Sequence, residues 1–246
     1  MPNEKHRTTN VSEQNTSGER VNRSDIDKET SKNLCTKATL KRKSQIKLSH
    51  AQNSPIPLHV YHQNIGGLRG KPNELICQLY PTSPHILCIT EHHMDYSELQ
   101  QTSFNNYKLG ASYCRNSYGK GGVCIFIQET LRYVRLDLKK HCKDKDFEVC
   151  ATKVHFNSRQ TIIIAIYRSP SGDFSSFITK LDIILRQLYK VTTVSVICGD
   201  INIDYLADSD RKRQLEALLI TYNLSGVVNF PTRTHKHSAT ALDIFL

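Results

Sequence analysis

Polar side chains that can bind a metal ion or a phosphate follow apolar runs at several points of this chain. The clearest example is Gly199-Asp200-Ile201-Asn202, which comes directly after the β-branched run 194–198. Such a run is typical of a buried strand, and the ligand sites of layered α/β proteins gather at strand ends. Because side chains two residues apart point the same way in an extended chain, we expect Asp200 and Asn202 to reach one phosphate or one water molecule.

Other apolar runs also carry polar residues at their ends or in their middle. These residues are Asn64 in the run 58–64, Glu91 in 86–91, Tyr167 and Arg168 in 161–168, and Asp243 in 241–246. Any one of them could be a solvated strand end, and strand-Gly-Asp turns such as the one at Gly199 are common. All of them together favour a shared site.

Phosphodiester hydrolysis is the chemistry that these residue types could perform. It needs a bound divalent cation, an activated water molecule, and positive or hydrogen-bond-donating groups for the developing charge. A carboxylate such as Glu91 suits the hard ion Mg²⁺, which keeps several waters and takes one or two protein carboxylates. The spacing itself shows only that these groups are available.

The order of the motifs along the chain is more specific than any one of them. The motifs are Gln63-Asn64-Ile65-Gly66-Gly67, Thr90-Glu91, Gly121-Gly122-Val123, Tyr167-Arg168-Ser169-Pro170, Gly199-Asp200-Ile201-Asn202 and Ser238-Ala239-Thr240-Ala241-Leu242-Asp243-Ile244-Phe245. This order resembles the endonuclease/exonuclease/phosphatase family, whose members include DNase I, exonuclease III and the apurinic endonucleases. The resemblance is closest to the endonuclease domain of non-LTR retrotransposons, and it spans residues 58–246.

The resemblance implies an α/β fold, namely a DNase I-like four-layer sandwich in which helices flank two packed mixed β-sheets. The spacing of apolar residues predicts helices over 72–80, 174–189 and 211–222. Further strands are expected over 121–128 and 147–156. Because strands outnumber helices, we expect consecutive strands to pair as hairpins and the sheets to stack.

The resemblance also implies which residues bind the metal and activate water. Glu91 is the expected metal ligand, for Mg²⁺ or alternatively Mn²⁺. Asn64 is expected to support the metal with its amide oxygen or to bind phosphate. Asp200 is expected to orient and deprotonate the attacking water molecule.

The remaining implied roles concern the phosphate and the DNA. Asn202 is expected to hold the phosphate, and Tyr167 to donate its hydroxyl to a phosphate oxygen. Arg168 and Thr232, the latter in the segment 231–233, are expected phosphate or DNA contacts. Asp243 matches the family's Asp that orients a closing histidine.

One departure from the family pattern concerns the end of the sequence. The family closes with a further strand ending in Ser-Asp-His, whereas this sequence stops at Leu246. We therefore expect the sandwich to lack its last strand and Asp243 to lack its histidine partner. The loss of such a donor typically costs on the order of 10²–10⁴ in rate.

Two functions stay open from the sequence. The first is a Mg²⁺-dependent endonuclease that nicks DNA, derived from a mobile element that also encodes a reverse transcriptase as a partner. The second is a catalytically impaired remnant that binds nucleic acid. A third, a phosphatase acting on a lipid or a small phosphate, is disfavoured by the retroelement form of the motifs and by the basic charge.

The chain is basic, with 33 Lys and Arg against 23 Asp and Glu and a net charge of +10. The excess is shared, since residues 1–57 carry 11 basic and 6 acidic residues and the rest carry 22 and 17. A basic chain favours polyanions such as DNA. Residues 1–57 lack apolar periodicity and predict a mostly disordered segment ahead of a domain over 58–246. Their basic run 41–47 could be a nuclear signal, a nucleic-acid patch or a solvated charge run.

Cysteine spacing and hydropathy limit which metals and partners the sequence predicts. None of the eight cysteines forms a Cys-x-x-Cys pair, so we do not expect zinc. We find no N-terminal apolar region and no apolar run near about eighteen residues, so we expect no signal peptide and no membrane partner. The composition favours the nucleus or the cytoplasm, and nothing in it indicates an oligomeric state.

Two further motifs invite a ligand-binding interpretation. The segment 119–123 resembles part of a phosphate loop, but it lacks the Gly-Lys-Ser/Thr ending and precedes a strand. We expect its glycine pair to serve a turn that needs positive φ or close backbone approach. His92 and His93 follow Glu91, and because adjacent strand residues face opposite ways, we expect them not to share one ion with it.

Overall fold

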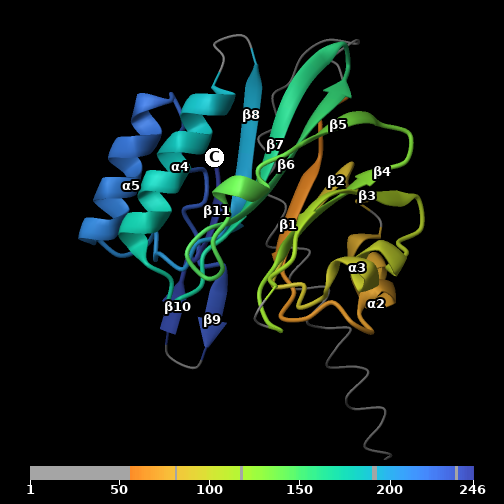
Figure 1. Ribbon diagram of the computed structural model, residues 1–246, viewed down its shortest axis with the longest axis horizontal. Helices are drawn as coiled ribbons and strands as arrows, with labels where there is room; N and C mark the ends of the chain where they lie inside the picture. Colours follow the sequence, from red (N-terminus) through yellow and green to blue (C-terminus); the bar gives the residue numbers. More distant parts are fainter. Residues whose placement is uncertain (1–55, 81, 117–118, 190–192, 236–237) are drawn as a thin grey trace, which may run out of the picture. The chain divides into compact units, whose positions relative to one another are not determined.

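Two β-sheets pack face to face in this protein (Figure 1). The computed structural model describes residues 56–80, 82–116, 119–189, 193–235 and 238–246. The predicted N-terminal segment 1–57, with its basic run 41–47, lies outside these ranges apart from residues 56 and 57.

The first sheet has four strands in the order β1-β2-β4-β3. They are β1 (Val60–Asn64), β2 (Ile86–Thr90), β3 (Tyr107–Tyr113) and β4 (Val123–Gln128). β1 and β2 run parallel to each other, and the other neighbours are antiparallel.

The second sheet has five strands in the order β11-β8-β7-β6-β5. They are β5 (Arg132–Leu136), β6 (Glu148–Phe156), β7 (Arg159–Tyr167), β8 (Val194–Asp200) and β11 (Asp243–Phe245). β7 and β8 are parallel, and the other pairs are antiparallel. A separate antiparallel hairpin consists of β9 (Arg233–His235) and β10 (Ser238–Thr240).

Helices cover the outer face of each sheet, as Figure 1 shows. They are α2 (Pro72–Leu79) and α3 (Tyr96–Gln101) on the first sheet and α4 (Phe174–Leu188) and α5 (Asp210–Thr221) on the second, with a short 3₁₀ turn, η1 (Lys139–His141). Residues that favour the start of a helix precede or open two of these helices. α2 has Pro at its first turn, and Asp173 caps α4 by accepting from the backbone N–H of Ser176. No helix among the described residues is long and apolar enough to cross a membrane.

The central strand β7 explains how the layers form. Its residues Ile162, Ile164 and Ile166 lie in a buried cluster with residues of α4 and α5, whereas Ala165 and Tyr167 lie in the cluster between the two sheets. Successive side chains of a strand point to opposite faces. Because both faces of β7 are buried, its sequence is a nearly continuous apolar run.

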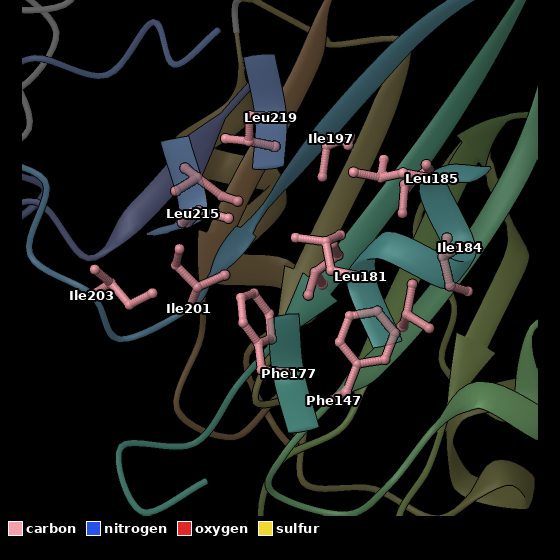
Figure 2. Packing of buried hydrophobic residues seen from close by; sticks show 14 of the residues in the cluster. Phe147, Phe177, Leu181, Ile184, Leu185, Ile197, Ile201, Ile203, Leu215 and Leu219 are labelled. Carbon is pink, nitrogen blue, oxygen red and sulfur yellow. The ribbon is translucent and has the colours of Figure 1, made fainter. Parts of the chain in front are cut away.

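The cluster under the helices is built largely from large apolar side chains. Figure 2 shows Phe177 and Leu181 of α4 beside Leu215 of α5 and Ile197 of β8 in this cluster. The ring centroids of Phe147 and Phe177 lie 5.8 Å apart. This packing sets the position of β8 and of the residues that follow its apolar run.

The four-layer α/β sandwich confirms the predicted fold class. The predicted helices correspond to α2, α4 and α5, and the predicted strands all form. The hairpin prediction is right for β3–β4, β5–β6 and β6–β7. It is wrong for β1–β2 and β7–β8, which are parallel because a helix connects each pair. The expected loss of a closing strand concerns positions beyond Leu246 and stays an expectation.

Candidate active site

Strand register brings the predicted polar residues of the second sheet into one row. Asp243 of β11 pairs with Asp200 of β8, and Asp200 pairs with Tyr167 of β7. Residues directly opposite on neighbouring strands point to the same face. Tyr167 belongs to the cluster between the sheets, so this row faces the first sheet.

The first sheet supplies the opposing half of the site. Asn64 pairs with Thr90 at the ends of the parallel strands β1 and β2, and Glu91 follows Thr90 directly. The carboxyl ends of parallel strands meet at one edge of a sheet. The two edges therefore place Asn64 and Glu91 against Asp200 and Tyr167, where all four side chains are connected by hydrogen bonds.

Asn64 is the centre of this hydrogen-bond network. Its Nδ2 donates to Glu91 Oε1 at 2.9 Å and to Asp200 Oδ2 at 2.7 Å. Its Oδ1 accepts from the backbone N–H of Gly66 at 3.1 Å. The prediction that Asn64 offers its amide oxygen to a metal does not fit this arrangement, because the nitrogen faces the carboxylates and the oxygen faces the following turn.

Glu91 accepts from three side chains. Besides Asn64, the hydroxyl of Tyr167 donates to Oε1 at 2.9 Å, and Nε2 of His93 lies 3.2 Å from Oε2. Burial raises the pKa of Glu91, but the three hydrogen bonds outweigh burial and leave the pKa below its ordinary value. Glu91 is therefore an ionised carboxylate at neutral pH.

Tyr167 is a protonated donor in this site. Burial and then the charge of Glu91 raise the pKa of Tyr167 well above its ordinary value. In this structure its hydroxyl donates to Glu91. The predicted contact of Tyr167 with a phosphate oxygen stays a prediction.

Asp200 is almost completely buried, with 5% of its surface exposed. Its Oδ1 accepts from the backbone N–H of Asn202 at 3.0 Å. Burial raises the pKa of Asp200 to about 7, with a further contribution from Asp243, although the hydrogen bond from Asn64 lowers it. A carboxylate whose pKa lies near neutrality is suited to take a proton from water.

The sequence pattern predicted an extended chain from Asp200 to Asn202, but the chain is not extended there. β8 ends at Asp200, and Asn202 has φ of 52°, in the left-handed region. Its Nδ2 donates to the backbone carbonyl of Arg168 at 2.8 Å. The expected parallel orientation of the two side chains is wrong because the chain turns between them.

Arg168 has a structural role in place of the predicted phosphate contact. It is fully buried, and its guanidinium donates to the backbone carbonyls of Ile201, Gly172 and Asn202 at 2.8, 2.8 and 2.9 Å. The predicted DNA contact is therefore wrong, because the donors are committed to the chain itself. Arg168 holds the loop after Asp200 in place.

Asp243 has a histidine neighbour within the described part of the chain. Nδ1 of His62 lies 3.5 Å from Asp243 Oδ1, and Nε2 of His62 lies 3.3 Å from Thr90 Oγ1. Burial lowers the pKa of His62 to about 4, although Asp243 raises it. His62 is not the closing histidine of the family pattern, so the expectation that Asp243 lacks that partner stays an expectation. Within the described part of the chain, Oδ1 of Asp243 is buried without a hydrogen-bond partner.

Thr232 is exposed and precedes β9, and its side chain lies beside the start of β11. Its Oγ1 accepts from the backbone N–H groups of Leu242 and Asp243 at 3.1 and 3.3 Å. This contact positions Asp243, while the predicted contact of Thr232 with phosphate stays a prediction.

Sequence reasoning missed a buried ion pair behind Tyr167. Glu148 is fully buried and accepts from Nε of Arg115 at 2.6 Å and from the backbone N–H of Gly122 at 2.7 Å. The Arg115 guanidinium lies 5.7 Å from the centroid of the Tyr167 ring. A charged residue at the start of the apolar strand β6 was the available signal for this pair.

The glycine pair of the segment 119–123 is confirmed as a turn element. Gly121 and Gly122 both have positive φ, of 90° and 87°. A Cβ atom on Gly122 would lie 2.3 Å from Nε2 of His92, a fully buried ring. The pair therefore provides close approach between the turn and the segment after Glu91.

The donor set fits a hard divalent ion. Glu91 is an ionised carboxylate with 24% of its side chain exposed, and Asp200 lies next to it through Asn64. Mg²⁺ commonly takes one or two carboxylates and keeps its other waters. Among the described residues, no group of three or more His, Cys, Asp or Glu is placed to hold an ion.

Comparisons with known proteins identify the fold. No protein-family model matches the sequence, and no curated protein matches it. The structure is similar to the endonuclease domain of TRAS1, a telomere-specific non-LTR retrotransposon, with a TM-score of 0.60 and 15% identity over 77% of this chain and 84% of the other.

Two further solved structures have the same architecture. An AP endonuclease from Archaeoglobus fulgidus aligns with a TM-score of 0.55 and 15% identity over 77% of this chain and 86% of its own. D. rerio TDP2 complexed with a single-strand DNA product aligns at 0.53 and 13% identity over 76% and 82%. The chain therefore has the DNase I-like fold, and the resemblance inferred from the motifs is confirmed at the level of fold.

Proposed function

We propose that this protein is a divalent-metal-dependent phosphodiesterase that nicks DNA. One observation carries the proposal, namely that Nδ2 of Asn64 joins Glu91 to Asp200. This link sets an ionised carboxylate that can hold a cation beside a carboxyl group whose pKa is about 7. Such a pair can bind a metal and activate water in one small site.

The residues divide the reaction between them. Glu91 would hold Mg²⁺, or alternatively Mn²⁺, which supplies Lewis-acid stabilisation of the phosphate charge. Asp200 takes the proton of the water that attacks phosphorus. As the new P–O bond forms, the bond from phosphorus to the 3′ oxygen breaks, and that oxygen leaves as a hydroxyl after it takes up a proton from solvent.

Other side chains complete the proposed site. The hydroxyl of Tyr167, now donating to Glu91, is placed to donate to a phosphate oxygen that approaches the carboxylate. Thr232, whose hydroxyl lies beside Asp243, is a proposed phosphate contact. Asn202 would become one only by giving up its hydrogen bond to the carbonyl of Arg168. Asp243 lies opposite Asp200 on the neighbouring strand and contributes to the raised pKa of Asp200.

DNA is the proposed substrate, and a retrotransposon the proposed origin. The net charge of +10 favours a polyanion. The three similar structures described above carry a nuclease name or a bound DNA product. The retroelement form of the motifs favours a domain that leaves a 3′ hydroxyl, from which a reverse transcriptase of the same element could extend DNA.

A catalytically impaired, DNA-binding remnant is the second candidate. The observation that favours it is the commitment of two predicted phosphate donors, Arg168 and Asn202, to backbone carbonyls. A nuclease with fewer free donors would stabilise the developing charge less well.

Nicking of supercoiled plasmid with Mg²⁺ separates the two candidates. The full chain is compared with Glu91→Gln, Asp200→Asn and the control Asp208→Asn, whose side chain is 82% exposed. The nuclease is supported if the parent chain and the control nick the plasmid and the two site variants do not. Binding of DNA at low salt without nicking by any of them supports the remnant, and no DNA binding at low salt contradicts both.

A further inference from the structure

Two residues of the proposed metal site have an unusual backbone conformation. Glu91 and His93 have φ of 55° and 57°, in the left-handed region, which few residues other than glycine adopt. Strained conformations of this kind cluster at functional sites, where the surrounding structure maintains them. The intervening His92 is buried, and its Nε2 lies 3.1 Å from the carbonyl of Tyr113.

The left-handed backbone conformation at Glu91 and His93 brings their side chains into contact. Nε2 of His93 lies 3.2 Å from Glu91 Oε2. The sequence-based expectation that neither histidine shares an ion with Glu91 assumed an extended strand. That assumption holds only up to Thr90, where β2 ends.

The backbone on both sides holds this geometry. The N–H of Glu91 donates to the carbonyl of Gly122 at 2.8 Å, and the N–H of His93 donates to that of Gly121 at 2.9 Å. Gly67 lies against the ring, since a Cβ atom there would be 3.3 Å from Nδ1 of His93. The backbone of His93 is therefore fixed, and its ring lies between Gly67 and the carboxylate of Glu91.

The carboxylate of Glu91 offers its two oxygens differently. Oε1 accepts from Asn64 and Tyr167, whereas Oε2 faces His93. The side chains of His93 and Glu91 are 18% and 24% exposed, so an ion with its waters can reach them. Because Nε2 of His93 and Oε2 of Glu91 are 3.2 Å apart, both atoms could hold one partly hydrated cation.

We propose that His93 is a second protein ligand beside Glu91, and that its imidazole moves the ion preference of the site from Mg²⁺ toward first-row transition ions. The proposal rests on the proposed function. Mg²⁺ favours oxygen ligands, whereas transition ions accept imidazole nitrogen readily. The bound ion would take the place of the direct contact between the His93 nitrogen and Glu91 Oε2.

Mn²⁺ is the probe that tests this proposal without an activity assay. Pulsed electron paramagnetic resonance on the full chain, prepared without a polyhistidine tag, detects nitrogen bound directly to Mn²⁺. The variant is His93→Asn, because Asn tolerates left-handed φ. The control is His141→Asn, which removes a half-buried ring that contacts Gln187 and lies outside the proposed site. Glu91→Gln shows whether the ion lies at this site.

The expected result is a nitrogen coupling that disappears in His93→Asn and persists in His141→Asn. The affinity for Mn²⁺ should fall at least fivefold in His93→Asn, while the affinity for Mg²⁺, measured by competition, should change less than twofold. Glu91-dependent Mn²⁺ binding without the nitrogen coupling, or an equal loss for both ions, overturns the His93 assignment and leaves the metal site intact. Absence of any Glu91-dependent Mn²⁺ binding overturns both this assignment and the proposed function.

Discussion

The amide nitrogen of Asn64 lies 2.7 Å from Asp200 Oδ2, although the two residues are 136 positions apart in the chain. Asn64 ends a strand of the first sheet, and Asp200 ends a strand of the second. The same nitrogen also donates to Glu91. One side chain thus connects the two sheets and both of the carboxylates that the proposed reaction needs.

Replacement of Asn64 by alanine should shift the pH dependence of nicking to higher pH. Its hydrogen bond lowers the pKa of Asp200, which burial raises to about 7, so its loss should raise that pKa further. The nicking rate at neutral pH should fall and recover partly in alkaline buffer. Asn73→Ala, at an exposed position of α2, is the control. An unchanged profile would show that Asn64 does not tune Asp200.

Asp200→Asn tests the role of the buried carboxyl group as a base. We expect the nicking rate to fall by about 10²–10⁴. The parent chain should show a rate that increases as the pH rises through about 7, the pKa of Asp200, and the variant should lack this inflection. A variant that retains the inflection would assign it to another group.

The same substitution should stabilise the fold at neutral and alkaline pH. The pKa of Asp200 is raised to about 7 in the folded protein, so the folded state favours the protonated carboxyl group. The resulting contribution to the free energy of unfolding is fully present below the pKa of Asp200 in the unfolded chain and is lost as the pH rises through 7. Each unit of pKa difference corresponds to about 1.4 kcal/mol. Thermal unfolding in the presence of a chelator should show that Asp200→Asn raises the melting temperature more at pH 8 than at pH 4, and an equal effect at both would contradict the raised pKa.

Arg168→Lys separates a structural role from DNA binding. Lysine lacks the planar fork that serves three carbonyls, so the free energy of unfolding should fall by roughly 3 kcal/mol. DNA affinity, measured by fluorescence anisotropy below the melting temperature, should change less than twofold. The control is Arg186→Lys, whose side chain is 75% exposed. A tenfold loss of DNA affinity with unchanged stability would instead support the predicted contact between Arg168 and phosphate.

Gly199→Ala should prevent stable folding. A Cβ atom at this position would lie 1.8 Å from the backbone carbonyl oxygen of Ile166 on the neighbouring strand β7. A backbone atom cannot move aside as a flexible side chain can, so we expect a loss of more than about 4 kcal/mol. Gly119→Ala, which meets no atom within 4 Å, should unfold like the parent chain in urea. Normal stability of Gly199→Ala would mean that β7 and β8 are spaced differently.

Much of the fold could be predicted from the sequence because local patterns specify it. The run of β7 is apolar throughout because both of its faces are buried. Helix α4 repeats apolar residues at helical spacing, and Asp173 caps it. The motif order also identified the polar residues Asn64, Glu91, Asp200 and Tyr167, which the structure brings together.

Only the tertiary structure decided how these side chains are used. The orientation of the Asn64 amide depends on two carboxylates that come from distant strands. Arg168 is buried because three carbonyls surround it, and the position of those carbonyls follows from the packing of whole elements.

The sequence by itself therefore determined which elements form and which polar groups end them, since periodicity and composition act over neighbouring residues. It could not determine that Glu91 and His93 both adopt left-handed φ and meet at Oε2. That conformation is unfavourable in the isolated chain. The glycine turn of residues 121 and 122 and the close approach of Gly67 hold it in the folded protein.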